Sequence, residues 1–307
     1  MADYRLPAEL WAIIFEYACT DTGATGRALS LTCVHFRELA RRVRLQCVAV
    51  VGAHQIVTFE AYLRTLPPDE RQVRHIFISS CPQTLSPDAP TAHTHVCRMP
   101  NSSGYYAVIE AYRSLLELVA PTLLTCYFSH SIARLSHLLP VSMPHLKSLV
   151  LHGPKPTWFV RSTQRFPELQ RLIFAGFCDY APESIDDLWA AAPAVECLYL
   201  ALKYPTRHLV TDLRASLRRR PRDTHSLRWR VRAGVSGEES LSPMPGNVQL
   251  ITIQVGERPP HGDLAICHMN VLRALQQLAD EDPRLVIEEP KACIHHTDTE
   301  LDWLANY

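Results

Sequence analysis

The sequence has no excess of charge of either sign. Its 31 lysine and arginine residues balance its 31 aspartate and glutamate residues, so the formal net charge is zero at neutral pH. A protein that binds nucleic acid or an anionic membrane surface depends on positive charge that attracts phosphate groups. The balance therefore argues against partners of either kind, and it predicts recognition by shape and local chemistry.

Long apolar runs are also missing. No stretch approaches the roughly 20 apolar residues that a membrane-spanning helix needs. The first ten residues carry Asp3, Arg5 and Glu9, where a secretory signal would need an apolar segment. We therefore expect an intracellular protein, located in the cytoplasm, the nucleus or both.

The cysteines form no C-x-x-C motif and no other close pair. The ten are Cys19, Cys33, Cys47, Cys81, Cys97, Cys126, Cys178, Cys197, Cys267 and Cys293. Scattered cysteines in a chain of 307 residues suit a reducing compartment better than a disulfide framework. We expect most of them to be buried thiols that fill the core.

Motifs of the common enzyme classes are absent. The chain has no G-x-S-x-G nucleophile elbow, no H-E-x-x-H zinc motif, no G-x-x-x-x-G-K-[ST] phosphate loop and no G-x-G-x-x-G dinucleotide fingerprint. The acid pairs Asp186 with Asp187 and Glu288 with Glu289 are adjacent in sequence, so their side chains point apart and are expected to be solvated. We expect no enzymatic activity and no cofactor.

One dense group of metal-ligand residue types occurs, at His93, His95 and Cys97. Alternate residues of an extended segment can point the same way, but no fourth ligand stands at a recognisable spacing. The pair His295 and His296 is a weaker signal still. We therefore expect no metal site.

What the sequence does contain begins with a predicted amphipathic helix at residues 6–18. Pro7 suits the first turn, where its missing N–H costs no hydrogen bond. Apolar side chains at helical spacing form one stripe: Leu6, Leu10, Ile13, Ile14 and Tyr17. A helix of about twelve residues is marginal alone, so the stripe needs something to pack on.

The glycines of residues 20–26 predict a loop, and residues 27–40 predict a second helix. Its apolar face carries Leu29, Cys33, Phe36, Ala40 and Val43, and its solvated side carries Arg37, Arg41, Arg42 and Arg44. Two or three short helices bury only part of their apolar surface against each other. The remainder favours binding of a second polypeptide.

These residues resemble an F-box in their order and spacing. The resemblance covers residues 6–40 and rests on Leu6-Pro7-x-Glu9-Leu10, Ile14-Phe15-x-Tyr17, Leu29-Ser30-Leu31-x-Cys33 and Phe36-Arg37-x-Leu39-Ala40. It implies a helical module that binds the Skp adaptor of a cullin-based ubiquitin ligase. By the family's pattern, the adaptor contacts are Leu6, Pro7, Leu10, Ile14, Phe15, Leu31 and Phe36.

The chain departs from the family's pattern in two places. Residues 19–26 form a longer loop than the common F-box turn, with Arg27-Ala28-Leu29 in place of an acidic-Leu-Leu continuation. Thr32 stands where an aliphatic residue is usual. The alternative is that residues 1–45 form a helical cap on the larger domain, since amphipathic helix pairs are common in globular proteins.

A second regularity follows further along the chain. Four segments share one template: Pro121-x-Leu123-x-x-Cys126-x-Phe128, Pro144-x-Leu146-x-x-Leu149-x-Leu151, Pro167-x-Leu169-x-x-Leu172-x-Phe174 and Pro193-x-Val195-x-x-Leu198-x-Leu200. Their prolines are 23, 23 and 26 residues apart, within the range of leucine-rich repeats. Fainter copies are Val73-x-x-Ile76-x-Ile78 and Val248-x-x-Ile251-x-Ile253. What resembles the leucine-rich repeat therefore covers about residues 70–255.

Each copy predicts a short strand followed by a helical segment, such as residues 131–139 and 184–189. Strands that return parallel after each helix stack into a curved solenoid. The asparagine or cysteine that usually follows the strand is replaced by Ser131, Pro154, Phe177 and Lys203. We therefore expect an irregular solenoid.

Residues 80–104 predict a long loop, and residues 105–120 predict a packed helix. The inner face of that helix should carry Val108, Tyr112, Leu115, Leu116 and Val119. Residues 261–279 and 297–307 predict helices that close the C-terminal end of the array.

An arginine-rich stretch offers candidate client-binding residues at Arg218, Arg219, Arg220 and Arg222. Guanidinium groups bind carboxylate and phosphate in bidentate fashion, so the stretch suits an acidic or phosphorylated client segment. One alternative is a solvated helix end, with Leu209, Leu213 and Leu217 packed inward. A nuclear-localisation signal is another.

Together these features predict an α/β protein with an F-box module at residues 1–50. An irregular leucine-rich-repeat-like recognition domain with a C-terminal helical cap follows at residues 51–307. The expected function is that of a substrate receptor in an SCF-type ubiquitin ligase, which binds a Skp-type adaptor, through it a cullin, and an unidentified client protein. The closing Leu301-Asp302-Trp303-Leu304 and the degenerate repeats resemble the F-box families of mushroom-forming fungi.

Two other functions remain as alternatives. One is a leucine-rich-repeat-like scaffold that binds protein without any ligase role, and the other is a hydrolase with an unrecognised site.

Overall fold

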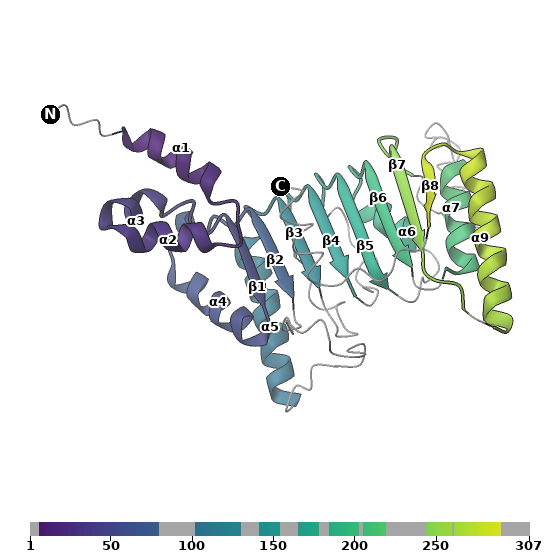
Figure 1. Cartoon of the computed structure of the whole chain (residues 1–307), viewed down its shortest axis with the longest axis horizontal. Helices are drawn as coiled ribbons and strands as arrows, with labels where there is room; N and C mark the ends of the chain where they lie inside the picture. Colours follow the sequence, from purple (N-terminus) through teal and green to yellow (C-terminus); the bar gives the residue numbers. More distant parts are fainter. Residues whose placement is uncertain are drawn as a thin grey trace, which may run out of the picture. The chain divides into compact units, whose positions relative to one another are not determined.

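Short strands alternate with helices along the chain, and every strand pairing in the structure is parallel (Figure 1). The structure, a computed structural model, describes residues 6–79, 102–129, 141–153, 165–177, 184–202, 205–218, 244–259 and 261–289. The chain forms two compact units, one made mainly of residues 1–131 and the other mainly of residues 146–293. The predicted α/β class is confirmed.

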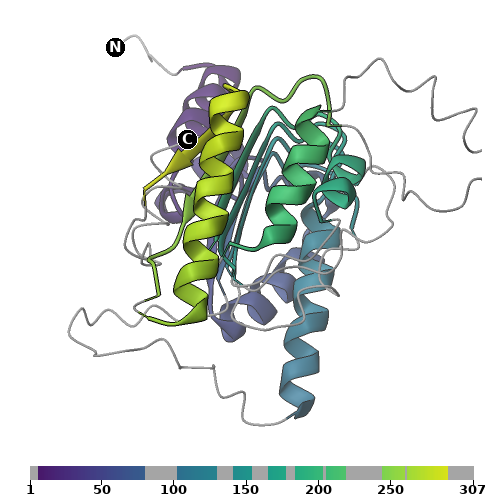
Figure 2. The ribbon, with the colours of Figure 1, turned by 90° about the vertical axis from the view of Figure 1, so that its right-hand side faces the viewer.

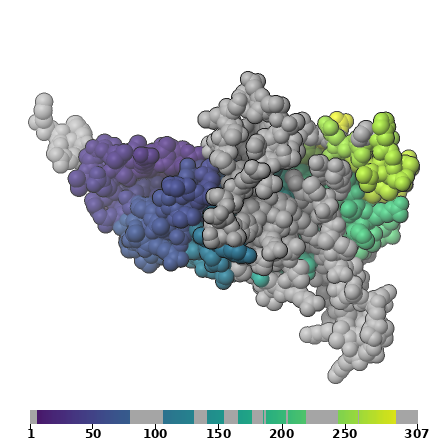
Figure 3. Space-filling view, turned by 90° about the horizontal axis from the view of Figure 1, so that it is seen from below, coloured from purple at the N-terminus to yellow at the C-terminus, as the bar shows by residue number. Residues whose placement is uncertain are grey.

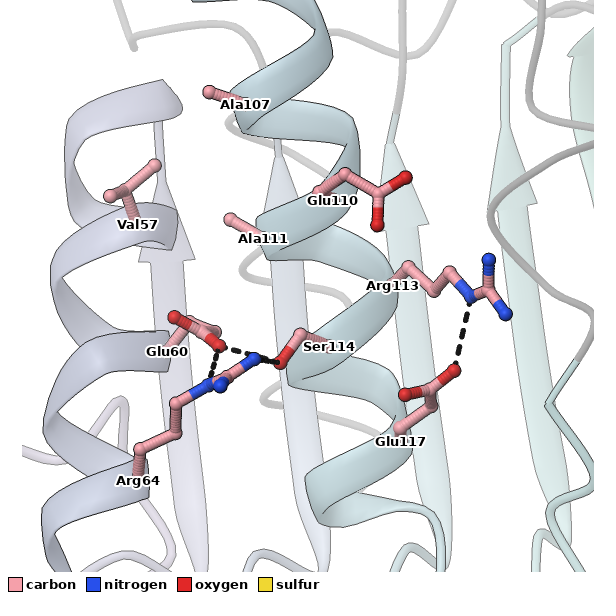
Figure 4. Close-up of a pocket in the computed structure, with 9 residues that line it drawn as sticks. All are labelled: Val57, Glu60, Arg64, Ala107, Glu110, Ala111, Arg113, Ser114 and Glu117. Carbon is pink, nitrogen blue, oxygen red and sulfur yellow. Dashed lines mark hydrogen bonds and ion pairs between the residues drawn. The ribbon is translucent and has the colours of Figure 1, made fainter.

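The first unit begins with three short helices and continues with strands and helices in alternation. Its elements are α1 (Ala8–Ala18), α2 (Ala24–Thr32), α3 (Val34–Ala40), β1 (Cys47–Val51), α4 (Ala53–Thr65), the 3₁₀-helix η1 (Pro68–Glu70), β2 (His75–Ser79), α5 (Ser102–Val119) and β3 (Thr125–Ser129). Strand β2 pairs with both β1 and β3, and Cys47, His75 and Thr125 lie in register. Helices α4 and α5 run side by side on the same side of the strands (Figure 4).

Helix α5 illustrates how a periodic pattern fixes a buried face. The five apolar residues predicted for its inner face are all buried: Val108, Tyr112, Leu115, Leu116 and Val119. The ring of Tyr112 meets the ring of Phe128 on β3 edge to face, with 5.3 Å between their centroids. The predicted helix at residues 105–120 is therefore confirmed, and it packs against the strands through this stripe.

In the second unit, strands alternate with helices from β5 onward among the described residues. Its elements are β4 (Ser148–His152), β5 (Arg171–Phe177), α6 (Ser184–Ala191), β6 (Cys197–Leu202), α7 (Arg207–Arg218), β7 (Leu250–Val255), α9 (Asp263–Glu281) and β8 (Leu285–Glu288). Each strand pairs with the next one in sequence, and a register shift interrupts the pairing of β5 with β6 between Phe174 and Phe177. Helices α7 and α9 lie side by side (Figure 2).

The apolar positions of the repeat template form the core of both units. In all six copies the three apolar positions of the template, which follow the proline in the four clear copies, are at most 7% exposed. They are Val73, Ile76, Ile78, Leu123, Cys126, Phe128, Leu146, Leu149, Leu151, Leu169, Leu172, Phe174, Val195, Leu198, Leu200, Val248, Ile251 and Ile253. Alternation along each strand places these side chains on one face, as the template predicts.

A main-chain motif repeats at the entrance of the strands. The carbonyl oxygen of the residue before a strand accepts two N–H groups from the start of the next strand. Gln46 accepts from Arg74 and His75, at 2.9 Å each. The same double acceptance links Arg74 to Leu124 and Thr125, Lys147 to Gln170 and Arg171, Gln170 to Glu196 and Cys197, and Glu196 to Gln249 and Leu250. These main-chain bonds hold neighbouring strands together, although the chain lacks the ladder of asparagine or cysteine side chains that leucine-rich repeats usually have after each strand.

The array of strands is longer than the sequence predicted. Strands β1 and β8 lie outside residues 70–255, and β1 pairs in parallel with β2 in the first unit as β8 does with β7 in the second. Strand β1 also begins before residue 50, where the boundary of the N-terminal module was predicted. The helix predicted at residues 184–189 corresponds to α6, and the one predicted at residues 261–279 corresponds to α9.

The predicted second helix is wrong in two respects. Residues 27–40 form two helices, because Cys33 has extended backbone angles (φ −160°, ψ 167°) between α2 and α3. The first of them starts earlier than predicted, at Ala24, after Gly23 with φ +98°. Asp21 stabilises this start by accepting hydrogen bonds from the N–H groups of Gly23 (3.0 Å) and Thr25 (2.8 Å).

Gly26 is a helical residue and not part of a loop, as its presence in α2 establishes. A Cβ at this position would lie 2.1 Å from the carbonyl oxygen of Arg44, so the helix packs directly on that backbone. The glycine therefore serves close approach between two segments.

Several predictions fall on residues that the structure does not describe. They are residues 80–101 of the loop predicted at residues 80–104, the helix at residues 131–139, the helix at residues 297–307 and the closing Leu301-Asp302-Trp303-Leu304. Residues 102–104 of that predicted loop are helical instead, because α5 begins at Ser102.

Six of the ten cysteines lie in the described residues, and all six are free thiols. Cys19, Cys47 and Cys126 are buried as predicted, whereas Cys33 and Cys267 are exposed. Burial raises the pKa of the Cys126 thiol to about 12, which keeps it protonated and unreactive.

We expect Leu172→Ala to lower the free energy of unfolding by about 3 kcal/mol, because Leu172 is fully buried on the core side of β5. Ile173→Ala is the matched control, because the side chain of Ile173, next to Leu172 in sequence, points to the opposite face and is only partly buried. It should cost about 1 kcal/mol. Urea unfolding measures both values, and equal costs would contradict the assignment of the core face.

His75 should make the stability of the chain depend on pH. Burial and the nearby charge of Arg74 lower the pKa of His75 to about 3. Below about pH 6.5 the imidazole of His75 is protonated in the unfolded chain, but in the folded chain it stays neutral down to about pH 3. The free energy of unfolding therefore falls as the pH falls through this range. The expected contribution is up to about 1.4 kcal/mol per pH unit, and His75→Gln should remove it. Urea unfolding from about pH 7 to about pH 4 measures this, and parallel curves for the two proteins would contradict it.

Candidate protein-binding surface

The apolar stripe of α1 is exposed to solvent. Leu10, Ile14 and Tyr17 are 45%, 43% and 79% exposed. Leu6 and Ile13, on the same stripe, are also exposed. Large apolar side chains gathered on one helix face are typical of a surface that another protein covers.

An aromatic cluster on the other side of α1 sets this orientation. The ring centroid of Phe15 lies 5.5 Å from that of Trp11 and 5.2 Å from that of Phe36 on α3, and Trp11 and Phe36 are 4.9 Å apart. Phe15 is 3% exposed. The cluster buries one side of α1 against α3, so the stripe is left on the outside.

The second and third helices add exposed apolar side chains of their own. Leu31 near the end of α2 is 71% exposed, and Val34 at the start of α3 is 69% exposed. Both flank Cys33, whose extended backbone separates the two helices. Cys33 also caps α3, because its sulfur accepts the N–H of Phe36 at 3.4 Å. The break in the helix therefore contributes to the exposure of both residues.

Hydrogen bonds fasten the three helices to the first strands. The Gln46 side chain donates from Nε2 to the carbonyl oxygen of Glu16 at 2.6 Å, and the N–H of Ala49 donates to the carbonyl oxygen of Thr22 at 3.3 Å. Arg74, just before β2, pairs with the carboxylate of Glu16. In the space-filling view the atoms of these helices form one continuous surface with those of α4 (Figure 3). Helix α1 and the loop before α2 are thus tied to the first strands.

The structure places the predicted adaptor-binding residues in three environments. Leu6, Pro7, Leu10, Ile14 and Leu31 are exposed. Phe36 is partly buried in the aromatic cluster. Phe15 is buried on the side of α1 opposite the stripe, where its ring contacts the rings of Trp11 and Phe36. Sequence reasoning did not include Ile13, Tyr17 and Val34 in this set. The helical spacing that pointed to Leu10 and Ile14 also points to Ile13 and Tyr17. The exposure of Val34, in contrast, depends on the break between α2 and α3, which the sequence did not predict.

The candidate client-binding arginines are described only in part. Arg218 ends α7, is exposed, and pairs with Glu281 of α9 at 3.3 Å. Leu209 and Leu213 of the same helix are buried, as the alternative of a solvated helix end predicts. Arg219, Arg220 and Arg222 lie outside the described residues.

A shallow groove of about 380 Å³ lies between α4 and α5 (Figure 4). The carboxylate of Glu60 accepts hydrogen bonds from Arg64 and from the hydroxyl of Ser114, and Arg113 pairs with Glu117 at 3.0 Å. Charged groups in the groove therefore largely satisfy one another. The groove offers no set of titratable groups that converge on a reacting atom.

The predicted metal and membrane features can be compared with the described residues. His93, His95, Cys97, His295 and His296 lie outside them. Within the described part of the chain, no group of three or more histidine, cysteine or acidic side chains is placed to hold a metal ion. No helix there has both the length and the apolar character to cross a membrane.

Comparison with known proteins gave no match to a protein-family model, a curated protein or a solved structure.

Phe15 and Tyr17, two of the three aromatic residues of α1, should differ sharply in their contribution to stability. We expect Phe15→Ala to cost about 3 kcal/mol or more, because it removes a buried ring that joins α1 to α3. Tyr17→Ala, the matched control, should change stability by about 0.5 kcal/mol or less, because Tyr17 is largely exposed. Hydrogen exchange of the α1 amides and urea unfolding check both. A costly Tyr17→Ala would mean that its ring is packed within the chain.

Proposed function

We propose that the chain is the substrate receptor of an SCF-type ubiquitin ligase, in which α1, α2 and α3 form an F-box that binds a Skp-type adaptor. The observation that carries this proposal is the exposed stripe of Leu10, Ile13, Ile14 and Tyr17. Burial of such side chains contributes about 25 cal/mol per Å² of apolar surface, which is the main driving force of protein association. The F-box resemblance supplies the kind of partner.

We propose that the strands and helices from β1 onward form an irregular leucine-rich-repeat solenoid that holds a client protein. Parallel strands, each followed in sequence by the next, support this proposal. On β4, β5 and β6 the strand face opposite the core carries the partly buried side chains of Val150, Ile173 and Tyr199. On β2, β3 and β7 the same face carries Phe77, Tyr127 and Thr252, which are buried. Arg218 is a further candidate for client contact. Its ion pair with Glu281 is exposed and therefore weak, so a carboxylate or phosphate of the client could replace Glu281.

The proposed mechanism is tethering. The adaptor links the receptor to a cullin and its ubiquitin carrier, and the repeat surface holds the client nearby, which raises the effective concentration of the client's lysines. The receptor makes and breaks no covalent bond. This role places the protein inside the cell, in the cytoplasm, the nucleus or both.

The alternative is a protein-binding scaffold without a ligase role. Such a scaffold would use the same repeat surface but would not bind the adaptor. Adaptor binding therefore separates the two functions.

The intact chain should bind a purified Skp-type adaptor, and Leu10→Asp combined with Ile14→Asp should abolish that binding. Each apolar anchor is worth about 2 kcal/mol, so the double change should weaken the complex roughly a thousandfold. Isothermal titration calorimetry measures the dissociation constant. Both residues are exposed, so the folded state should be retained.

The matched control carries Leu264→Asp and Ile266→Asp on α9, which are 70% and 61% exposed. This control should bind the adaptor as the unchanged protein does. Retained affinity in the Leu10 and Ile14 variant would contradict the proposed contact surface, and no binding by the unchanged chain would favour the scaffold.

A further inference from the structure

Arginines lie beside the exposed apolar side chains of α2 and α3. Arg27 precedes Leu31 by four residues on α2, and Arg37 follows Val34 by three residues on α3. Residues at these spacings are neighbours on a helix surface. Arg42, in the turn after α3, adds a further exposed guanidinium group. Apolar contacts and positive charges therefore share one surface.

Most of this positive charge is not neutralised within the chain. Residues 24–44 contain Arg27, Arg37, Arg41, Arg42 and Arg44 but only one acid, Glu38. Arg41 pairs with Glu38 and Glu70, and Arg44 pairs with Glu70 at 3.2 Å. In the described part of the chain, no carboxylate forms an ion pair with Arg27, Arg37 or Arg42.

The orientation of Arg37 is fixed by a main-chain contact. Its Nε donates to the carbonyl oxygen of Ser30 at 2.8 Å, across the break at Cys33. The bond bridges the end of α2 and the start of α3, between Leu31 and Val34. A neutral acceptor leaves the charge of the guanidinium group in place, so the remaining N–H groups of Arg37 can meet a carboxylate of a partner.

Helix α1 carries charge of the opposite sign. It has Glu9 and Glu16 and no basic residue, and Glu16 pairs with Arg74. Among the three N-terminal helices, basic residues therefore lie on α2, on α3 and in the turn that follows, and not on α1. Such an asymmetry steers an oppositely charged partner and fixes its orientation.

We infer that the adaptor meets α2 and α3 with an acidic surface. Its carboxylates pair with Arg27, Arg37 and Arg42 at the edge, while its apolar side chains cover Leu31 and Val34. This inference rests on the proposed function and adds the charge of the partner's surface. It assigns two separate roles: the arginines accelerate association, and the apolar residues of α1 slow dissociation.

Stopped-flow measurement of the intact chain with a purified Skp-type adaptor tests this inference. The association rate constant should fall at least about fivefold as salt rises from about 0.05 M to about 0.5 M, because salt screens exposed charges. Arg27→Gln combined with Arg42→Gln should lower that rate constant about threefold or more at low salt. The dissociation rate constant should change less than about twofold.

The matched control removes two exposed arginines of the second unit, through Arg207→Gln and Arg273→Gln. It carries the same change in net charge and should leave both rate constants unchanged. Leu10→Asp, by contrast, should act mainly on dissociation.

Two outcomes would overturn the inference. Adaptor binding whose association rate is indifferent to salt and to the loss of Arg27 and Arg42 would show that the facing surface is not acidic, and the proposed function would stand. Absence of adaptor binding at every salt concentration would overturn the proposed function and this inference together.

Discussion

The contact of Trp11, Phe15 and Phe36 determines what the N-terminal helices present to solvent. An α-helix of this length can bury only one of its sides in a small module. The three rings take up the side of α1 that faces α3, with Phe15 almost completely buried. The apolar stripe must therefore lie on the opposite side of α1. The proposed partner surface depends on this separation of a buried side from an exposed side.

The core of the strands depends on a similar division. Alternate residues of each strand point inward, and the template leucines, isoleucines and phenylalanines occupy those positions in every described copy. The periodicity is short, local and repeated, so it could be read from Leu149 and Leu151 or Ile76 and Ile78 without knowledge of the neighbours. Helix α5 could be predicted for the same reason, since Tyr112, Leu115 and Leu116 follow a helical period.

Features that depend on contacts between distant residues could not be predicted in this way. The break at Cys33 involves neither glycine nor proline, and Gly26 suggests a loop until the backbone of Arg44 is seen beside it. Strand β1 fits the template in its spacing, with Leu45, Val48 and Val50, but it lacks the proline that marks the clear copies. Strand β8 has no such spacing and is held by its pairing with β7.

For the candidate surface, sequence reasoning identified the stripe but not which aromatic residue lies beneath it. Phe15 and Tyr17 are both aromatic and two positions apart, yet one is buried and the other is exposed. The phase of the helix relative to α3 decides between them. That phase is a tertiary property and leaves no local signal.

The paired N–H groups that meet one carbonyl before each strand have a consequence for how such a chain can change over time. Every residue except proline supplies the same main-chain donors and acceptors, so the spacing between neighbouring strands is preserved through most substitutions. Some outward-facing side chains add links of their own between strands, as where the hydroxyl of Tyr199 donates to Gln254 at 2.9 Å. Partly buried outward positions such as Val150 and Ile173 can therefore change from one descendant to another while the main-chain framework beneath them keeps its dimensions.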